Sequence, residues 1–472
     1  MIRLKNLVPL VAFCTSAGSV FGFVQKTTDS GTFALKRLVL PIQYRINEKG
    51  TFDVPGIAER AAVDAAFATW GAISNSNLAF SGGTTTAGFD PMDGMSTILW
   101  MDDASDNTLV VGRPDLLALT DVRFFVNSGE IISADIAMNG VSFSWSVSGN
   151  DNFSSLKGPV DIQAVVTHEI GHFIGLDHVT NSTSVMFPTM YVGDTSSRSL
   201  SQDELSAAVF IYPSAGAPAE SSISGQVTRG GVGVSRAYVA AFQGGRAIVG
   251  VMADATGNYR IRRLPPGVYQ VRAQPYSNSD AVTQTLFYQV SSNVDVNFLS
   301  ILYTNTASES SATSVTVNSG ADTPNINLSV SASGNVNDPF EDDDTGSTAK
   351  PIALDGSAQI HHSWDSTPVG DEDWVTYNAV AGRLYVIETR SLGLEPTDPG
   401  ASAAHSTTQL ELYDSSATSP PYPAPLASNT FRNSFEGDNG SRIVAFEAAN
   451  AVRKVRARQR QPTTKGAGAY FD

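Results

Sequence analysis

The sequence predicts a multidomain protein in which an α/β (α+β) domain precedes two all-β modules. Its 472 residues exceed what one hydrophobic core normally organises, and this length suggests about three domains. A helical stripe of apolar residues lies early in the chain, at Val63, Phe67 and Trp70. After residue 222, short alternating runs rich in Val, Gly and Tyr predict strands. Residues 214–222, rich in Pro, Ala and Ser, predict the linker between these parts.

Residues 1–22 have the composition of a secretory signal peptide. Arg3 and Lys5 precede an apolar run at 7–13, and small residues lead to a cleavage position after Gly22. The apolar run is too short to span a membrane, and no later stretch is long enough. We therefore predict an exported protein without a membrane span, with a short N-terminal segment at 23–39.

Cysteine usage favours bacterial export. Cys14 is the only cysteine and lies within the signal segment, so the mature chain has no disulfide. Lipid attachment at Cys14 is the alternative, but Phe13 is bulky where a small residue is expected. We expect a freely secreted, extracellular protein.

Composition excludes one class of partner. Only 16% of the residues are charged, and the net charge is −16. This balance argues against nucleic acid, because phosphate binding needs basic patches. The one basic cluster, residues 453–460, fits a charged strand face or tail better than a binding patch.

The first domain has a regular series of predicted elements. Residues 41–46 alternate as a strand does, and residues 57–73 form an Ala-rich helix. Further strands are expected at 96–101, 119–126 and 131–139. A last helix is expected to begin at Ser201, with Glu204 completing a capping box.

Three of the six histidines lie between His168 and His178, with Glu169 after the first. His168 and His172 are four residues apart on a helix, so both imidazoles can reach one zinc ion at about 2.0–2.1 Å. Glu169 lies about 100° round the helix, where it can reach a water on that ion but not the ion itself.

The third histidine requires the helix to stop. On a continued helix, His178 would lie roughly 240° from the metal-binding face. Gly175 can adopt the left-handed conformation of a helix C-terminus and let the chain double back. Three histidines leave a fourth position open, which is typical of catalytic zinc. A buried amphipathic helix that carries histidines by chance is the alternative.

The segment from His168 to His178 resembles the metzincin signature, and its last four residues resemble the matrixin branch. Ser184-Val185-Met186-Phe187-Pro188 is similar to that family's Met-turn, in which Met186 would form an apolar floor under the histidines. The resemblance covers residues 40–213 and implies a catalytic domain with a twisted mixed sheet and an active-site helix.

The resemblance also implies the chemistry. His168, His172 and His178 would hold one catalytic Zn²⁺, Glu169 would be the general base, and extended peptides would pair with strand 119–126 as an edge strand. A second, structural zinc needs histidines that this region lacks, whereas Ca²⁺ held by Asp and carbonyl oxygens is compatible with the sequence.

Two β-sandwich modules are expected after the linker. Residues 223–332, which include a stretch at 307–330 that is either part of the module or a strand-bearing linker, resemble carboxypeptidase regulatory-like modules. Residues 338–472 resemble a prepeptidase C-terminal domain. Their acidic runs could bind Ca²⁺ but fit solvated loops better, and His361, His362 and His405 are expected at the surface.

The sequence thus predicts a secreted zinc metalloendopeptidase of the matrixin type, acting on extracellular proteins or peptides. The alternative is a secreted adhesin or binding protein with a catalytically silent zinc domain, against which the intact Glu169 argues. The sequence does not predict the oligomeric state.

Overall fold

A computed structural model describes residues 23–28, 33–90, 92–102, 116–148, 159–179, 181, 184–190, 194–275, 295, 298, 300–306, 311–331, 345–352, 354, 372–388, 408–429, 432–433, 438–459 and 469–471. The signal segment 1–22, the acidic run 338–344 and the histidines His361, His362 and His405 lie outside these residues. No helix within the described ranges is long and apolar enough to cross a membrane.

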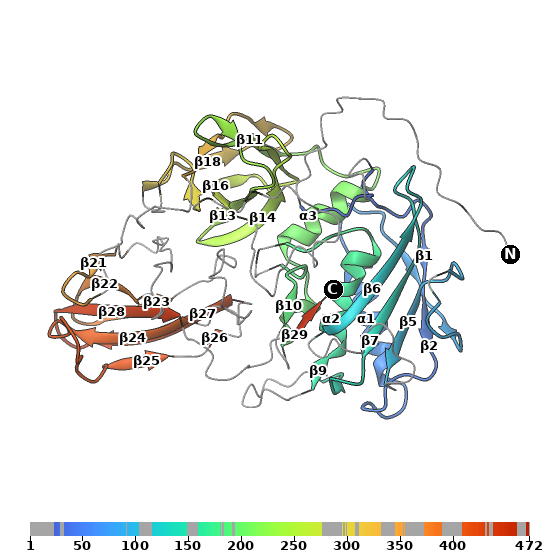
Figure 1. Cartoon of the computed structure of the whole chain (residues 1–472), viewed down its shortest axis with the longest axis horizontal. Helices are drawn as coiled ribbons and strands as arrows, with labels where there is room; N and C mark the ends of the chain where they lie inside the picture. Colours follow the sequence, from blue (N-terminus) through green and yellow to red (C-terminus); the bar gives the residue numbers. More distant parts are fainter. Residues whose placement is uncertain are drawn as a thin grey trace.

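The first part of the chain is an α+β domain (Figure 1). Its elements are β1 (Ile42–Gln43), β2 (Arg45–Asn47), α1 (Ala58–Gly71), β3 (Phe80–Ser81), β4 (Thr84–Thr85), β5 (Thr97–Met101), β6 (Leu116–Phe124), β7 (Ile131–Asn139), β8 (Trp145–Ser146), β9 (Val160–Asp161), α2 (Ile162–Phe173), β10 (Thr189–Met190), a 3₁₀ helix (Ser196–Arg198) and α3 (Gln202–Ile211). The predictions of a helix at 57–73 and of strands at 96–101 and 131–139 are confirmed, with shorter ends at the first two.

Seven strands form one mixed sheet in the order β10-β29-β6-β7-β5-β2-β4, where β29 is Ala469–Phe471. β6 and β7 are antiparallel, with Leu119 opposite Ala137, whereas β7, β5 and β2 run parallel. Two sequence predictions need correction here. The strand predicted at 41–46 is two short strands, because the chain pairs first with β3 and then with β4 and β5. The predicted edge strand, β6, is covered at its beginning by β29.

The two long helices pack together beside this sheet. Trp70 on α1 is fully buried, and its indole Nε1 donates a hydrogen bond to the carbonyl of Thr167 on α2, at 2.9 Å. Phe67 stacks on Tyr44 and meets Phe173 of α2 edge to face, with ring centroids 3.7 and 5.5 Å apart. The apolar stripe of α1 therefore fixes α2 in place.

The N-terminal segment is part of this domain's packing. The backbone carbonyl of Val24 accepts the N–H of Asp177 at 2.9 Å, and Lys26 donates its N–H to Gly175 at 2.8 Å. Arg37 is buried and donates to the carbonyls of Phe173 and Ile132, at 3.2 and 3.1 Å. Residues before 40 thus contact the loop that follows α2.

Two β-rich parts follow. The first contains β11 (Ser222–Arg229), β12 (Val232–Gly233), β13 (Tyr238–Gln243), β14 (Arg246–Met252), β15 (Asn258–Arg262), β16 (Gly267–Gln274), β17 (Ile301–Leu302), β18 (Val315–Val317), β19 (Asp322–Thr323) and β20 (Leu328–Ser329). Its strands form two sheets, built around β11 and around β13 and β16. This part touches the first domain directly, since Asp203 of α3 accepts the N–H of Gly250 on β14 at 2.8 Å.

The second β-rich part contains β21 (Lys350–Pro351), β22 (Glu372–Ala379), β23 (Arg383–Glu388), β24 (Thr408–Asp414), β25 (Ala427–Asn429), β26 (Arg432–Asn433), β27 (Asp438–Glu447) and β28 (Ala451–Gln459). Residues 453–459 of the basic cluster lie on the central strand β28, as the interpretation as a strand face predicts, and Arg460 lies outside the described residues. Arg453 pairs with Glu447, and Arg456 pairs with Glu411. The charges of Arg453 and Arg456 are therefore paired within this part of the chain.

Candidate metal centre

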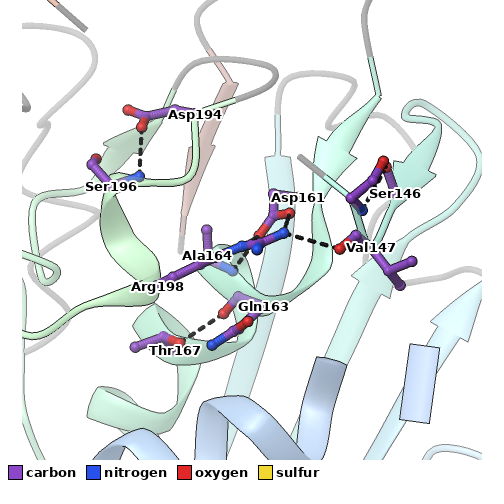
Figure 2. A network of polar contacts seen from close by, with 10 residues as sticks. Ser146, Val147, Asp161, Gln163, Ala164, Thr167, Asp194, Ser196 and Arg198 are labelled. Carbon is purple, nitrogen blue, oxygen red and sulfur yellow. Dashed lines mark hydrogen bonds and ion pairs between the residues drawn. The ribbon is translucent and has the colours of Figure 1, made fainter. Parts of the chain in front are cut away.

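The helix that carries the first two histidines is held at its start by Asp161. This N-cap residue accepts a hydrogen bond from the N–H of Ala164 at 2.9 Å, as a short acidic side chain at an N-cap does. Figure 2 shows that Arg198, from the 3₁₀ helix, pairs with the same carboxylate and donates to the carbonyl of Val147, at 3.0 Å. The sequence gave no signal that Arg198 would pair with this cap residue.

Gly175 ends the helical segment in the left-handed region, with φ of +105°. Its N–H bonds to the carbonyl of His172 at 3.0 Å, and the N–H of Leu176 bonds to that of Gly171 at 2.8 Å. A Cβ at position 175 would lie 2.3 Å from the carbonyl oxygen of Leu35. Glycine is thus required both by the turn and by the N-terminal segment packed on it.

The three histidines converge on one point. Nε2 of His178 lies 3.2 Å from Nε2 of His168 and 3.1 Å from Nε2 of His172. All three side chains are fully buried. In the described part of the chain, this is the one group of three or more His, Cys, Asp or Glu residues whose ligand atoms all lie within 4.8 Å of one another.

Backbone carbonyls determine which ring nitrogens face the centre. Nδ1 of His168 lies 2.6 Å from the carbonyl of Val185, and Nδ1 of His172 lies 2.9 Å from that of Leu176. Each Nδ1 therefore carries the hydrogen and donates it, which leaves the Nε2 lone pair directed inward. Sequence reasoning had identified the histidines but not these two carbonyls.

Burial keeps the rings of His168 and His172 neutral. Desolvation lowers the pKa of His168 to about 3 and the pKa of His172 well below its usual value. Desolvation also raises the pKa of Asp177, the residue before His178. Neutral imidazole is the form that binds a metal ion.

This arrangement fits zinc. Three nitrogens at about 2.0–2.1 Å from a tetrahedral ion lie about 3.3–3.4 Å from one another, close to the two separations of 3.1 and 3.2 Å found here. Three inward-facing lone pairs in a buried site are satisfied by a cation that all of them contact.

Glu169 is buried on the same helix, next to the first histidine. The hydroxyl of Thr120, on β6, donates to its carboxylate Oε2. The same hydroxyl lies 3.3 Å from the backbone carbonyl of Glu169. The sequence predicted the strand but gave no signal that this threonine meets the glutamate, because the contact spans 49 residues.

Met186 lies beneath α2, against Gly171. A Cβ at position 171 would be 2.1 Å from the Met186 sulfur, so only glycine allows this approach. The turn that carries Met186 is fixed by Glu204, which accepts the hydroxyl hydrogen of Ser184. Glu204 also forms the capping box of α3 with Ser201, as predicted. The role of Glu204 in holding the methionine turn was not predicted.

Comparisons with known proteins agree with this geometry. The family model for matrixin matches residues 36–213. Metalloendoproteinase 2-MMP of Arabidopsis thaliana is 38% identical over 69 residues, which are 14% of this chain and 18% of that protein. Matrix metalloproteinase-26 of Homo sapiens is 35% identical over 63 residues, 13% of this chain and 24% of that protein. The chain thus spans about a fifth to a quarter of the length of these relatives.

Two solved structures of BcpA, the major pilin subunit of Bacillus cereus, also match. One covers 52% of this chain and 60% of the pilin, and the other covers 51% and 59%, at 7% and 10% identity. Both have a TM-score of 0.14, a value that supports no conclusion about shared fold. The family match and the relatives instead identify residues 36–213 as a matrixin domain.

Proposed function

We propose that this chain is an exported zinc metalloendopeptidase that hydrolyses peptide bonds of extracellular proteins. The observation that carries the proposal is the convergence of three buried Nε2 atoms, two separations being 3.1 and 3.2 Å, next to the buried carboxylate of Glu169. Within the residues that the structure describes, no feature favours the alternative of a binding protein with a silent zinc domain.

His168, His172 and His178 would hold the ion through Nε2. When bound, zinc supplies Lewis acidity, which polarises the scissile carbonyl and acidifies a water molecule. Glu169 takes the proton from that water and delivers it to the leaving amine. The Nδ1 contacts of His168 and His172 with backbone carbonyls keep both rings oriented and in the required tautomer.

Substrate would bind as an extended chain along β6 (Leu116–Phe124), whose middle residue Thr120 contacts Glu169 beside the metal centre. Backbone hydrogen bonds to a strand provide affinity with little dependence on sequence. This mode agrees with a peptidase that acts within polypeptides.

Export and domain organisation complete the proposal. Export rests on the basic and apolar pattern of residues 1–22. The β-rich parts, proposed as modules 223–332 and 338–472, would serve location or recognition of large substrates, because every proposed ligand lies within residues 40–213. Calcium remains a prediction without an assigned site.

Zinc content and cleavage of a peptide library by the purified chain test the proposal. We expect one zinc per chain and cleavage that a chelator abolishes and added zinc restores. Cleavage that persists after complete metal removal, or a zinc-loaded chain that cleaves no peptide or protein, would contradict it.

A further inference from the structure

A short strand from the far end of the chain lies in the sheet of the matrixin domain. β29 (Ala469–Phe471) is inserted between β6 and β10, and Figure 1 shows it in red beside the strands of the first domain, apart from β28 and its sheet. Its nearest partners in sequence are hundreds of residues away. The contact is thus a tertiary one between the end of the last module and the proposed catalytic domain.

The pairing is made on both sides. Tyr470 lies opposite Leu116 of β6 in parallel register, and opposite Thr189 of β10 in antiparallel register. Ala469 pairs with Met190. Backbone groups of β29 therefore bond in two directions, as in the interior of a sheet.

Both partner strands lead from β29 toward the metal centre. Phe471 lies opposite Ala118, two residues before Thr120, which contacts Glu169. On the other side, β10 begins at Thr189, three residues after Met186. Going from Ala469 to Phe471, the chain thus approaches the proposed base along one wall and the methionine turn along the other.

This geometry defines a slot with a strand on each wall. Leu116 and Ala118 on β6 are fully buried, and Met190 on β10 is 3% exposed. Without an occupant, both walls would present unpaired N–H and C=O groups, which template pairing with another chain. An extended peptide segment satisfies both walls at once.

We infer that residues 469–471 are an autoinhibitory segment that occupies this slot and excludes extended substrates. The inference rests on the proposed function, because β6 is the strand along which substrate would pair. In this interpretation residues 469–471 control the activity, because displacement or removal of this segment opens the slot.

The test compares two chains that both carry Glu169→Gln, the full sequence and a version lacking residues 469–472. The probe is a fluorescein-labelled peptide with the sequence of residues 465–472, and its binding is read by fluorescence anisotropy. If the segment fills the slot about 90% of the time, the apparent affinity of the full chain is about tenfold weaker than that of the shortened chain. Equal affinity of the two chains would overturn the inference.

A second comparison uses active chains. Removal of residues 469–472 should raise turnover of a short peptide about tenfold at low substrate concentration, for the same reason. Tyr470→Pro should act like the deletion, since proline lacks the N–H and is excluded from the interior of a sheet. Tyr470→Ala is the matched control, because it keeps the backbone donor and should stay closer to the parent chain.

These measurements separate the two proposals. Tighter peptide binding by the shortened chain, with no turnover in any version, would sustain the slot and refute the peptidase. Equal turnover and equal peptide binding would refute the autoinhibitory segment while the peptidase stands. Loss of residues 469–472 from the active full chain by its own cleavage, detected by mass spectrometry, would show a substrate and not an inhibitor.

Discussion

The hydroxyl of Thr120 on β6 donates a hydrogen bond to the carboxylate Oε2 of Glu169 on α2. Both side chains are buried, at 5% and 0% exposure. The strand that would bind substrate and the helix that would supply the base are thereby joined through the Thr120 hydroxyl. A base is effective only when its carboxylate is held in a productive orientation.

Replacing Thr120 by valine tests this positioning role. The variant keeps the β-branched shape and loses the donor, so kcat should fall by about 10- to 100-fold, since a hydrogen bond to a charged group is worth about 1.5–3 kcal/mol. Thr120→Ser keeps a hydroxyl and should retain most activity. Steady-state kinetics and zinc content of both variants measure the effect. Equal kcat for the Thr120→Val and Thr120→Ser variants would show that the Thr120 hydroxyl does not position Glu169.

Gly171→Ala should destabilise the protein although alanine is the better helix former. Its Cβ would lie 2.1 Å from the sulfur of Met186, and overpacking of a buried site costs about 1–3 kcal/mol. Gly88→Ala is the control, because no heavy atom lies within 4 Å of a Cβ there. Urea denaturation measures both variants. A Gly171→Ala protein as stable as the parent would show that the methionine turn adapts freely.

Arg37→Met should reveal that the N-terminal segment belongs to the domain. The change leaves the carbonyls of Phe173 and Ile132 without this donor and removes a guanidinium that lies 4.4 Å from the centroid of the Phe173 ring. We expect a loss of about 2–4 kcal/mol in the free energy of unfolding. The neighbouring Lys36 is exposed, so Lys36→Met should be neutral. Equal stability of the two variants would show that the Arg37 contacts of the N-terminal segment do not stabilise the domain.

The metal-free protein should lose stability below about pH 6.5, the ordinary pKa of histidine. Burial lowers the pKa of His168 to about 3 in the folded chain. Between about pH 6.5 and 3 the unfolded chain therefore binds more protons than the folded chain, and the free energy of unfolding decreases as the pH is lowered. Burial raises the pKa of Asp135 to about 6. Between about pH 3.8 and 6 the folded chain therefore binds more protons at this carboxyl, and this contribution to the free energy of unfolding increases as the pH is lowered.

Asp135→Asn separates these contributions. Without the carboxyl, the acid loss of stability should be steeper than in the parent, because the protonated folded form of Asp135 no longer offsets the histidines. Urea midpoints of chelator-treated protein from pH 7.5 to 4 measure it. If the stability of the variant decreased less steeply at acid pH than that of the parent, the stabilising contribution assigned to protonated Asp135 would be contradicted.

The metal centre and much of the scaffold could be predicted because their signals are local. His168 and His172 share a helix face through their spacing, and Gly175 marks the turn within the same eleven-residue segment. The cap at Ser201 follows equally from neighbouring residues. Contacts between segments that are distant in the sequence have no comparable local signal.

Three of those distant contacts changed the account of the site. Thr120 reaches Glu169 from another element, Arg37 reaches Phe173 from the N-terminal segment, and Tyr470 pairs with Leu116 from the last module. In each case side-chain packing or backbone pairing between strands brings the two residues together, and both depend on the assembled fold. The beginning of the predicted edge strand is therefore covered by a segment that no local pattern could indicate.

Peptide cleavage by Glu169→Gln, measured beside bound zinc, tests the central claim most directly. The amide keeps the size of the side chain and leaves His168, His172 and His178 intact, so one zinc per chain should remain. Turnover should fall by about 10²- to 10⁴-fold, the contribution of a positioned general base. A zinc-loaded variant that cleaves at the rate of the parent would contradict the assignment of Glu169 and the mechanism built on it.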